Sequence, residues 1–374
     1  MKKLVSAVAV LAVSMSGTAQ AAGYVFDVLA GRGTGMGSAM VGHVDDASAV
    51  FYNAAGIAQG KGFDLQLGAT FIAPDFDVIA AGGGGREESP SVSKLPPPHA
   101  YATWGITDDL SVGLGFFIPY GLAYEYPEDF SGRFVITEAD LRVYVINPTV
   151  AYKWRQFRFG GGVQVVRGTV LLGKDILLPE NQIGAVELGG AGWAVGGNLG
   201  VQWEPLPNKL KFGAFYRSTF SLDLKGNAHF SGVEDPSLRT TLRDQPITAN
   251  FKLPDQIGAG VAFRPVDRLL LDFDAVYYGW QRFQDITVVF PEDSALTLRE
   301  PKEWRGKVNY HLGGEYTLTD NWQVRTGLLY DPTPQPVETL SPDLPENSRL
   351  NLTAGGTYRR GRYRADLGYQ YIIF

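Results

Sequence analysis

From residue 63 to the end of the chain, apolar side chains recur at every second position, and this alternation limits the fold more than any other feature. In an extended chain, Leu65, Leu67 and Phe71 fall on one side, and Asp64 and Gln66 on the other. Successive side chains of a β-strand point to opposite faces, so the pattern predicts strands with one apolar and one polar face. It recurs along the chain, for example at residues 111–118, 198–204, 269–275, 322–328 and 363–371.

Both soluble β-sandwiches and transmembrane β-barrels show this alternation of apolar and polar residues. The lengths of the connections between strands are therefore needed to distinguish the two folds. Short turns are predicted at residues 107–109, 155–156, 205–208, 265–267, 320–321 and 360–361. Long polar or Gly/Pro-rich connections alternate with them at residues 75–97, 121–138, 179–190, 231–247, 291–303 and 331–348. Bacterial barrels have short periplasmic turns and long outer loops, whereas a sandwich has no reason to sort connections by end. We therefore predict an all-β fold, a transmembrane antiparallel β-barrel.

Aromatic residues near the predicted strand ends fit the interfacial girdles of such a barrel. They are Trp104, Tyr120, Trp154, Trp203, Tyr277, Trp280, Trp304, Trp322 and Tyr330.

The number of predicted strands is odd. Thirteen candidates are found, at residues 63–74, 98–106, 110–120, 139–154, 157–177, 191–204, 209–230, 248–265, 268–290, 304–319, 322–336, 348–360 and 363–374. Bacterial single-chain barrels have even strand numbers, and an open edge in lipid is costly. Either the pattern hides one further strand or the closing strand is missing at the C-terminus of this chain, and we favour the second explanation.

The N-terminus has the layout of an export signal. Lys2 and Lys3 precede an apolar run, and small residues lead to an Ala-Gln-Ala site ending at Ala21. The run is shorter than the ~20 residues that cross a bilayer as a helix. We predict a signal peptide at residues 1–21, an N-terminal hatch or plug at 22–62 and the barrel at 63–374, located in the bacterial outer membrane.

Composition excludes several kinds of chemistry. The chain has 374 residues, no Cys and four His, and its formal net charge is −6. Disulfides, thiolate metal sites and cysteine nucleophiles are therefore ruled out. Lys and Arg are scattered, mostly as single residues, so no basic stripe exists to bind nucleic acid. We expect no metal, no cofactor and no enzyme activity.

Residues 22–62 break the alternation. They are rich in Gly, Ala and Ser, and residues 45–52 form a short helical candidate that starts at an acidic pair. About forty residues cannot form a core of their own, whereas the lumen of a large barrel has room for them. The segment is therefore predicted to be a lumenal plug.

This segment resembles the N-terminal hatch of the FadL-type family of outer-membrane long-chain fatty-acid and hydrocarbon transporters. Its family motifs fall on Ala22-Gly23-Tyr24, Gly35, Gly37, Ala39, Gly42, Asp46, Ala47, Ser48, Asn53, Ala55 and Gly56. Position 54 is Ala where the family has Pro, which removes a constraint on φ. Weaker matches follow in order at residues 119–124, 147–153, 253–256, 277–283, 325–334 and 342–349. The family has fourteen strands, and residues 363–374 resemble its thirteenth.

The resemblance implies passive transport. Family members are expected to capture a hydrophobic compound among the outer loops and to pass it to a lumenal pocket bounded by a hatch of short helices. Hatch movement then releases it sideways into the bilayer. A dry path lowers the cost of leaving water by ~0.8 kcal/mol per CH₂ buried. The expected partners are fatty acids or hydrocarbons, together with outer-membrane lipid and lipopolysaccharide.

We expect the route to be lined by aromatic and small residues of the hatch and nearby strands: Tyr24, Phe26, Phe51, Asn53, Gly56, Phe71, Phe116 and Phe117. A cargo carboxylate would require a cation. Lys174 and Arg299 occupy places similar to those of basic residues in the fatty-acid transporters, although solvated loop charges are an alternative explanation for both.

Two other functions stay open. A general porin or a structural barrel shares every strand feature and needs no hatch. An outer-membrane lipid hydrolase is a weaker alternative, supported only by His229-Phe-Ser231. Deletion of residues 24–56 separates them, because it should abolish uptake by a transporter and leave ester cleavage by a hydrolase.

Overall fold

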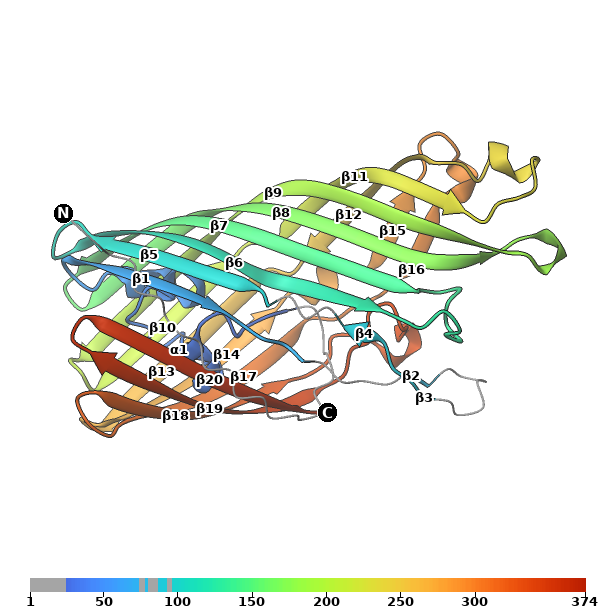
Figure 1. Ribbon diagram of the computed structural model, residues 1–374. Helices are drawn as coiled ribbons and strands as arrows, with labels where there is room; N and C mark the ends of the chain where they lie inside the picture. Colours follow the sequence, from blue (N-terminus) through green and yellow to red (C-terminus); the bar gives the residue numbers. More distant parts are fainter. Residues whose placement is uncertain (1–24, 74–77, 80–86, 93–95) are drawn as a thin grey trace, which may run out of the picture.

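The protein is a tall, twisted antiparallel β-barrel (Figure 1). The computed structural model describes residues 25–73, 78–79, 87–92 and 96–374. The predicted signal peptide and Tyr24 lie outside the described residues. The wall strands are β1 Gly62–Ala69, β5 Pro98–Gly105, β6 Leu110–Glu125, β7 Glu138–Trp154, β8 Phe157–Leu177, β9 Ile183–Leu206, β10 Leu210–Arg217, β11 Phe220–Ser231, β12 Gln245–Leu253, β13 Gln256–Val266, β14 Leu269–Tyr278, β15 Asp285–Val289, β16 Leu298–Pro301, β17 Lys307–Thr317, β18 Trp322–Asp331, β19 Arg349–Arg360 and β20 Tyr363–Ile373.

The predicted fold class is confirmed. Short strands β2 (Val78–Ile79), β3 (Glu87–Glu88) and β4 (Ser91–Val92) belong to the first outer connection. The outer connections carry the 3₁₀ turns η2 Pro179–Asn181, η3 Leu238–Thr240, η5 Ser294–Leu296 and η6 Val337–Thr339, whereas η4 Trp280–Arg282 lies between β14 and β15. Among the described residues, no helix is long and apolar enough to cross a membrane.

Three predicted strands are interrupted in the structure. Residues 209–230 form β10 and β11, residues 248–265 form β12 and β13, and residues 268–290 form β14 and β15. The second break falls at Pro254, which has no N–H to donate to a ladder. β10 then pairs with β13, and β11 with β12. The wall therefore has a lower and an upper part that meet along this line of breaks.

All six predicted short turns join neighbouring strands at one end of the barrel. Arg155 and Gly361 take positive φ angles of 56° and 60° in two of these turns. The predicted loop at 121–138 is shorter than expected, because β6 continues to Glu125, and the predicted loop at 179–190 is largely wrong, because β9 already begins at Ile183. The glycines in these stretches suggested loops, yet the ladders between β6 and β7 and between β8 and β9 run through them. The wall consequently extends far beyond the short-turn half.

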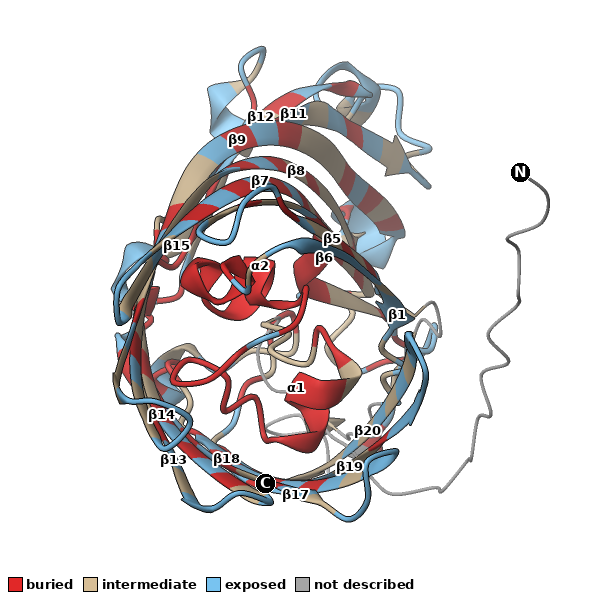
Figure 2. Ribbon diagram, turned by 90° about the vertical axis from the view of Figure 1, so that its left-hand side faces the viewer, coloured by how far each residue is buried: buried red, intermediate tan, exposed pale blue. Residues whose placement is uncertain are grey.

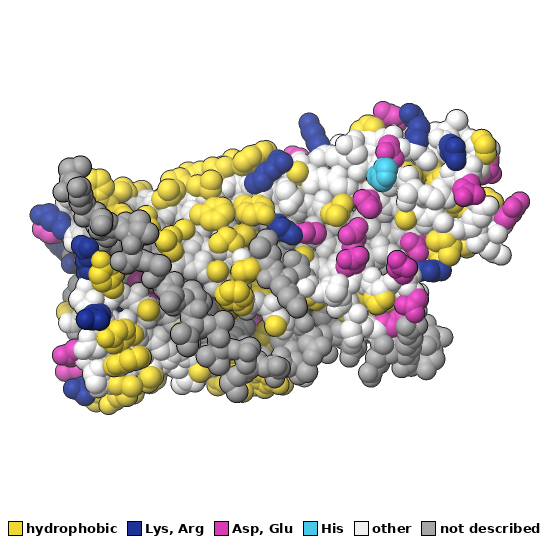
Figure 3. Space-filling model, viewed as in Figure 1, with side chains coloured by type: hydrophobic (Ala, Val, Ile, Leu, Met, Phe, Trp, Pro, Cys, Tyr) yellow, Lys and Arg dark blue, Asp and Glu magenta, His cyan; other side chains and the backbone are white. Residues whose placement is uncertain are grey.

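On the face seen in Figure 3, apolar side chains dominate the short-turn half apart from charged groups at the turns themselves, and acidic side chains gather toward the other end. An aromatic row runs across neighbouring strands, with Phe157 and Trp203 stacked at 5.9 Å between ring centroids and Trp203 and Phe212 at 5.5 Å. Both features match a lipid-facing band with an interfacial girdle. Three residues expected in the girdles are buried instead: Tyr120, Trp280 and Trp304.

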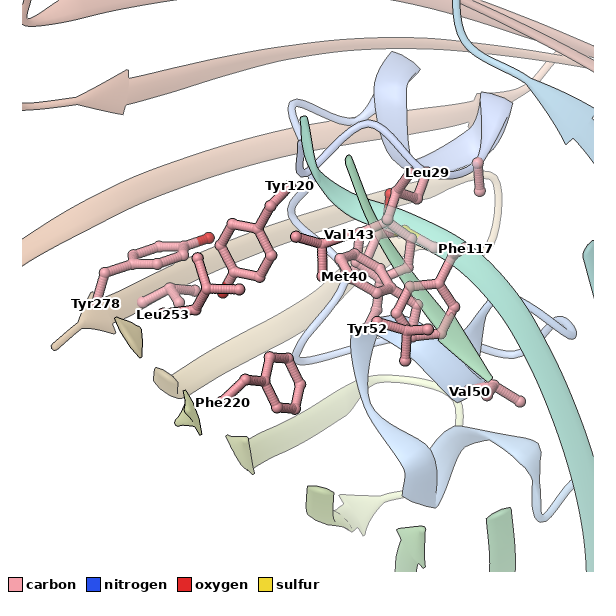
Figure 4. Close-up of a cluster of buried hydrophobic side chains, with 14 of the residues drawn as sticks. Leu29, Met40, Val50, Tyr52, Phe117, Tyr120, Val143, Phe220, Leu253 and Tyr278 are labelled. Atoms are coloured by element: carbon pink, nitrogen blue, oxygen red, sulfur yellow. The ribbon is translucent and has the colours of Figure 1, made fainter. Parts of the chain in front are cut away.

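Residues 25–61, called the lumenal segment below, lie inside the ring of strands (Figure 2). The segment contains α1 (Gly31–Gly35), α2 (Ala49–Tyr52) and the 3₁₀ turn η1 (Ala54–Ile57). The predicted helix at 45–52 is shorter than expected and begins at Ala49, after a turn. Three apolar residues of the lumenal segment, Leu29, Met40 and Val50, are fully buried in an apolar cluster that side chains of the wall complete (Figure 4).

β1 and β20 are the two outermost strands of the sheet. β1 pairs with β5 and β20 with β19, and the described residues contain no ladder between β1 and β20. The lumenal segment contacts both. The backbone N–H of Ala47 donates to Asp64 Oδ2 on β1 at 3.1 Å, and Arg364 on β20 is 3.5 Å from Asp46 Oδ2. The segment thus connects the two strands through polar contacts.

Candidate functional site

An apolar pocket lies in the upper part of the barrel, away from the short turns. It encloses about 730 Å³ of space, including the part open to solvent. All but two of its lining residues are apolar or Gly, and the exceptions are Asn250 and Asp343. The wall of the pocket is formed by Leu122, Ala139, Leu141, Val170, Leu172, Leu188, Gly190, Leu224, Gly226, Ile247, Ala249, Phe251, Ile286 and Val288. Such a lining removes apolar solutes from water, and its one charged residue, Asp343, is paired with Lys302.

Residues 341–344, called the cover segment below, close part of this pocket from the β18–β19 connection. Asp343 and Leu344 line the pocket, and Lys302 Nζ is 2.5 Å from Asp343 Oδ2. The Tyr124 hydroxyl donates to the Asp343 carbonyl oxygen at 2.6 Å. Lys302 is only 2% exposed, so this ion pair is shielded from solvent. The cover segment is therefore fixed by one buried ion pair and by a tyrosine hydroxyl of β6.

The lumenal segment is anchored to the wall by two carboxylates of β14. Asp274 Oδ2 accepts hydrogen bonds from the backbone N–H groups of Met40 and Val41, each at 2.7 Å, and its Oδ1 accepts one from Gly42 at 3.2 Å. Asp272 Oδ2 accepts one from the N–H of His43 at 2.9 Å. Four consecutive buried donors are thus satisfied by one strand, which matters because an unpaired buried N–H is costly.

A second anchor is a buried network around Arg32 of α1. Its guanidinium binds Asp45 and Asp46 within the lumenal segment and Glu315 on β17, the last at 3.0 Å. Arg325 on β18 binds the same Glu315 at 2.7 Å. Charges removed from water need such partners. Burial lowers the pKa of the nearby His43, and Asp45 opposes that shift.

A third contact joins α2 to β10 near the centre of the lumen. Arg217 is 3% exposed and donates from one terminal nitrogen to the Phe51 carbonyl oxygen at 2.6 Å. Its other terminal nitrogen donates to Gln256 Oε1 at 2.7 Å, and Gln256 Nε2 donates to the Tyr120 hydroxyl at 3.1 Å. The guanidinium carbon also lies 4.6 Å from the centre of the Phe51 ring. A polar chain therefore runs from α2 through β10 and β13 to β6.

The wall is irregular at β6, where this row of polar contacts ends. The β5–β6 ladder stops at the pair Ala100 and Phe116, and the β6–β7 register shifts between Phe117 and Tyr120. The lumenal segment covers the exposed edge of β6 here. Val25 forms a bridge with Tyr120, and the N–H of Phe26 donates to the Pro119 carbonyl oxygen at 2.8 Å. The edge of β6 is thus paired with the leading end of the lumenal segment.

The predicted hatch residues that the structure describes serve mainly as packing and capping groups. Phe51 is buried against Phe117, with ring centroids 5.1 Å apart. Asn53 accepts from the N–H of Ala55, and its amide donates to the Val41 carbonyl oxygen at 3.0 Å. A Cβ at Gly56 would come within 2.5 Å of the Val44 carbonyl oxygen, so only Gly fits there.

The remaining predicted residues lie apart from one another. Phe71 is 69% exposed beyond the end of β1, and Phe116 stacks with Tyr144 at 6.4 Å, on the face of β6 opposite to Phe117. Lys174 is half-buried on β8. Arg299 is exposed on β16 and pairs with Asp285 at 3.1 Å. None of the nine predicted site residues that the structure describes lines the apolar pocket.

Most pocket residues lie in predicted strands, but the sequence does not show that these strand positions face one another, and the remaining pocket residues lie in ranges that were interpreted as loops. Leu122, Leu188 and Gly190 belong to strands that continue beyond the expected boundaries. The alternation of apolar and polar residues does continue there, as in Leu122 and Tyr124 of β6. When it is followed over a longer stretch of sequence, it predicts that the strands extend into these ranges. The role of Arg217 was not predicted, because the sequence does not show that Phe51 and Gln256, which are distant along the chain, contact it in the fold.

A lipid-facing β-barrel with a filled lumen and an apolar pocket at its outer end belongs to the class of outer-membrane proteins that pass solutes. Residues 12–374 match the family described as outer membrane protein transport protein (OMPP1/FadL/TodX), and the chain belongs to this family. It is therefore an outer-membrane transport protein and not an enzyme.

Individual relatives support this assignment over nearly the whole length. The chain is 25% identical to the long-chain fatty acid transport protein of Escherichia coli K12, over 98% of this chain and 91% of the relative. It is 26% identical to the 47 kDa outer membrane protein of Pasteurella multocida, over 95% and 87%. Among solved structures, a Pseudomonas aeruginosa FadL homologue superposes with a TM-score of 0.79 at 19% identity, over 94% and 92% of the chains. The Pseudomonas putida toluene transporter TodX gives 0.70 at 18% identity, over 95% and 94%.

Proposed function

We propose that this protein carries hydrophobic compounds such as long-chain fatty acids or hydrocarbons passively through the outer membrane. The observation that carries the proposal is the apolar pocket, whose lining has only two polar residues, Asn250 and Asp343. Relatives and structural neighbours are named for long-chain fatty acids and for toluene, which are both apolar over most of their surface. Each CH₂ that enters such a pocket gains ~0.8 kcal/mol.

Capture takes place above the lipid-facing band. The charged outer surface of the upper wall stands among the headgroups and lipopolysaccharide, while its inner face is apolar. The cover segment controls entry, because Lys302 and the Tyr124 hydroxyl hold it over the pocket. A solute enters when these contacts open.

Aromatic side chains continue from the pocket toward the β6 irregularity. Phe251 lines the pocket and lies 5.1 Å from Phe283, measured between ring centroids. Trp280 is 6.3 Å from Phe283 and 6.5 Å from Tyr120. This row provides apolar contact from the pocket to the position where Val25 bridges Tyr120. A solute that follows the row stays out of water.

The lumenal segment then acts as the hatch, and release occurs sideways at the interrupted edge of β6. Displacement of Val25 and Phe26 uncovers the edge between the end of the β5–β6 ladder and β4. A sideways exit delivers the solute into hydrocarbon and avoids the periplasm. Because Leu29, Met40 and Val50 fill the lumen, a water-filled pore of the general porin type is disfavoured.

A charge placed in the pocket tests this function. Leu224→Glu puts a carboxylate among the lining residues, whereas Lys225→Glu puts the same group on the exposed face of the same strand. We expect Leu224→Glu to reduce the uptake of labelled hexadecan-1-ol by about tenfold or more, because an unpaired buried charge is costly, and Lys225→Glu to leave uptake unchanged. Equal uptake by both variants, with free passage of small hydrophilic solutes, would instead identify a general porin.

A further inference from the structure

The outer face of the wall carries cations between its apolar and its acidic parts (Figure 3). The strand registers arrange the outward-facing residues of neighbouring strands in rows. The first row is apolar and consists of Ile146, Val165 and Val195. Two residues nearer the outer end, the second row consists of Tyr144, Arg167 and Trp193. The third row, again two residues further, consists of Arg142, Thr169, Ala191 and Lys225.

The second and third rows together are called the basic belt below. Their positions alternate with pocket-lining residues of the same strands, such as Val170 and Leu224, so their side chains point away from the lumen. Four residues beyond the third row, the register brings together an acidic row of Glu125, Glu138 and Glu187. The outer face therefore changes from apolar to basic to acidic over a short height.

The basic belt lies where the lipid-facing band ends. Trp193 and Trp203 are both on β9, ten residues apart, counted as 203 minus 193, and Trp203 belongs to the aromatic row of the short-turn half. At ~3.3 Å per residue and a tilt of about 40°, they are separated by roughly 25 Å along the barrel axis, the height of the apolar band of such barrels. Trp193 is 63% exposed, which suits a second interfacial girdle. The belt thus stands at the level of the outer-leaflet headgroups.

Two cations of the basic belt have no anionic partner among the described residues. Arg167 lies over the Trp193 ring, with its guanidinium carbon 5.1 Å from the ring centre, and Lys225 is exposed; neither forms an ion pair within the described part of the chain. Arg142 donates to Asp140 at 2.8 Å and is half-buried. A guanidinium that stacks on an aromatic ring keeps the N–H donors of its edge available to an anion.

The width of the basic belt indicates which headgroup fits. Arg142 on β7 and Lys225 on β11 are three strand spacings apart, because β8 and β9 lie between them. At ~4.8 Å per spacing, the belt is about 14 Å wide, much wider than one phosphate group. A glycerophospholipid with one phosphate can engage only one end of it. A glycolipid with a phosphate at each end of a disaccharide can engage both.

We propose that the basic belt binds the two phosphates of lipopolysaccharide, one at Arg142 and Arg167 and the other at Lys225. The acyl chains then lie against the apolar row below, and the acidic row above repels the phosphates from a higher position. The bound lipid fixes the height of the barrel in the outer leaflet and keeps the pocket above the hydrocarbon. This anchoring goes beyond transport and does not depend on the cargo, because the belt and the pocket lie on opposite faces of the wall.

Binding of two lipids that differ only in their phosphates tests the site. The full chain in detergent is titrated with labelled bisphosphorylated lipid A, the membrane anchor of lipopolysaccharide, and with the dephosphorylated form of the same lipid. Charge-assisted hydrogen bonds to two phosphates should favour the bisphosphorylated form by about tenfold or more. Arg167→Gln combined with Lys225→Gln should reduce this preference to about twofold or less.

A matched pair of substitutions controls for the loss of charge. Lys209→Gln combined with Arg268→Gln removes one Lys and one Arg from exposed short turns at the other end of the barrel and should keep the full preference. Binding of hexadecan-1-ol should stay within about twofold of the parent in both double variants, which shows that they are folded. Phosphatidylglycerol, which carries one phosphate, should compete for the belt at least about tenfold less effectively than bisphosphorylated lipid A.

Equal binding of the two lipid A forms by the parent chain overturns the proposed anchor, and so does a preference that survives in Arg167→Gln with Lys225→Gln. Competition by phosphatidylglycerol that matches that of lipid A shows that the belt accepts any anionic headgroup, and it overturns the assignment to lipopolysaccharide. None of these results touches the proposed transport, which fails separately if the parent chain does not bind hexadecan-1-ol.

Discussion

Asp274 on β14 accepts a hydrogen bond from the backbone N–H of Val41 at 2.7 Å, although 233 positions separate the two residues in sequence. The contact shows how the lumenal segment is held. At this anchor, the wall supplies acceptors through two side chains, and the segment supplies donors through its backbone. The anchoring strength therefore depends on single wall residues, each of which can be tested.

Asp274→Ala should loosen the lumenal segment without unfolding the barrel. Three backbone N–H groups, those of Met40, Val41 and Gly42, lose their acceptor. We expect a cost of about 3 kcal/mol, the scale of buried unsatisfied donors. Amide exchange at residues 40–43 should rise while the β17–β18 ladder stays protected. Asp267→Ala, in an exposed turn beside β14, is the control, and equal exchange in both variants would contradict the anchor.

Asp343→Ala should open the pocket. The variant removes the closer carboxylate of Lys302 and leaves, among the described residues, Glu300 at 3.3 Å as the remaining ion-pair partner of this buried ammonium. Breaking a buried pair costs about 3–5 kcal/mol, so the cover segment should detach. Limited proteolysis near residues 341–344 should become faster, and hexadecan-1-ol should enter faster. Slower entry would show that the cover segment helps to bind the cargo and does not restrict its access.

A disulfide between positions 25 and 120 should block transport. Val25 and Tyr120 are bridge partners, and the chain contains no Cys, so Val25→Cys with Tyr120→Cys gives a single defined crosslink. Oxidation should stop uptake, and reduction of the same sample should restore it. The reduced protein is its own control for the loss of the Tyr120 ring. Transport that continues in the fully oxidised protein would place the exit elsewhere.

The β18–β19 connection should be pH-sensitive through Glu346. Burial raises the pKa of Glu346 from 4.5 to about 7, although Lys307 and Arg349 oppose the shift. The folded connection therefore holds a proton that the unfolded one has lost. The resulting stabilisation is complete below pH 4.5 and disappears as the pH rises through about 7.

Proteolysis of residues 332–348 should accordingly be faster at pH 8 than at pH 5. Glu346→Gln cannot ionise, and its proteolysis should change little between these pH values. A parent chain with a flat profile, or a variant that keeps the full pH dependence, would contradict this assignment to Glu346.

Local pattern was sufficient to predict the six short turns and the presence of most strands, though not all strand ends, because these features depend on neighbouring residues. The alternation of Leu65 and Leu67, or the turn at Arg155, needs no distant partner. The breaks in the wall could not be predicted from the local pattern alone. Pro254 indicates that a hydrogen-bond donor is missing, but it does not indicate which strands pair on either side of the break. The site was the least predictable part. Arg217 lies at the end of an ordinary strand, and its significance comes from Phe51 and Gln256, which only the closed barrel brings together.

The length of β8 decides where a solute loses its water. Val170 is thirteen residues beyond Phe157, counted as 170 minus 157, and it lines the pocket. At ~3.3 Å per residue and a tilt of about 40°, this places it roughly 33 Å above the short turns, higher than the ~25 Å apolar band of such barrels. In the proposed transport, dehydration would therefore be completed outside the bilayer. Occupancy of the protein should follow the concentration dissolved in the medium rather than the amount already partitioned into the membrane.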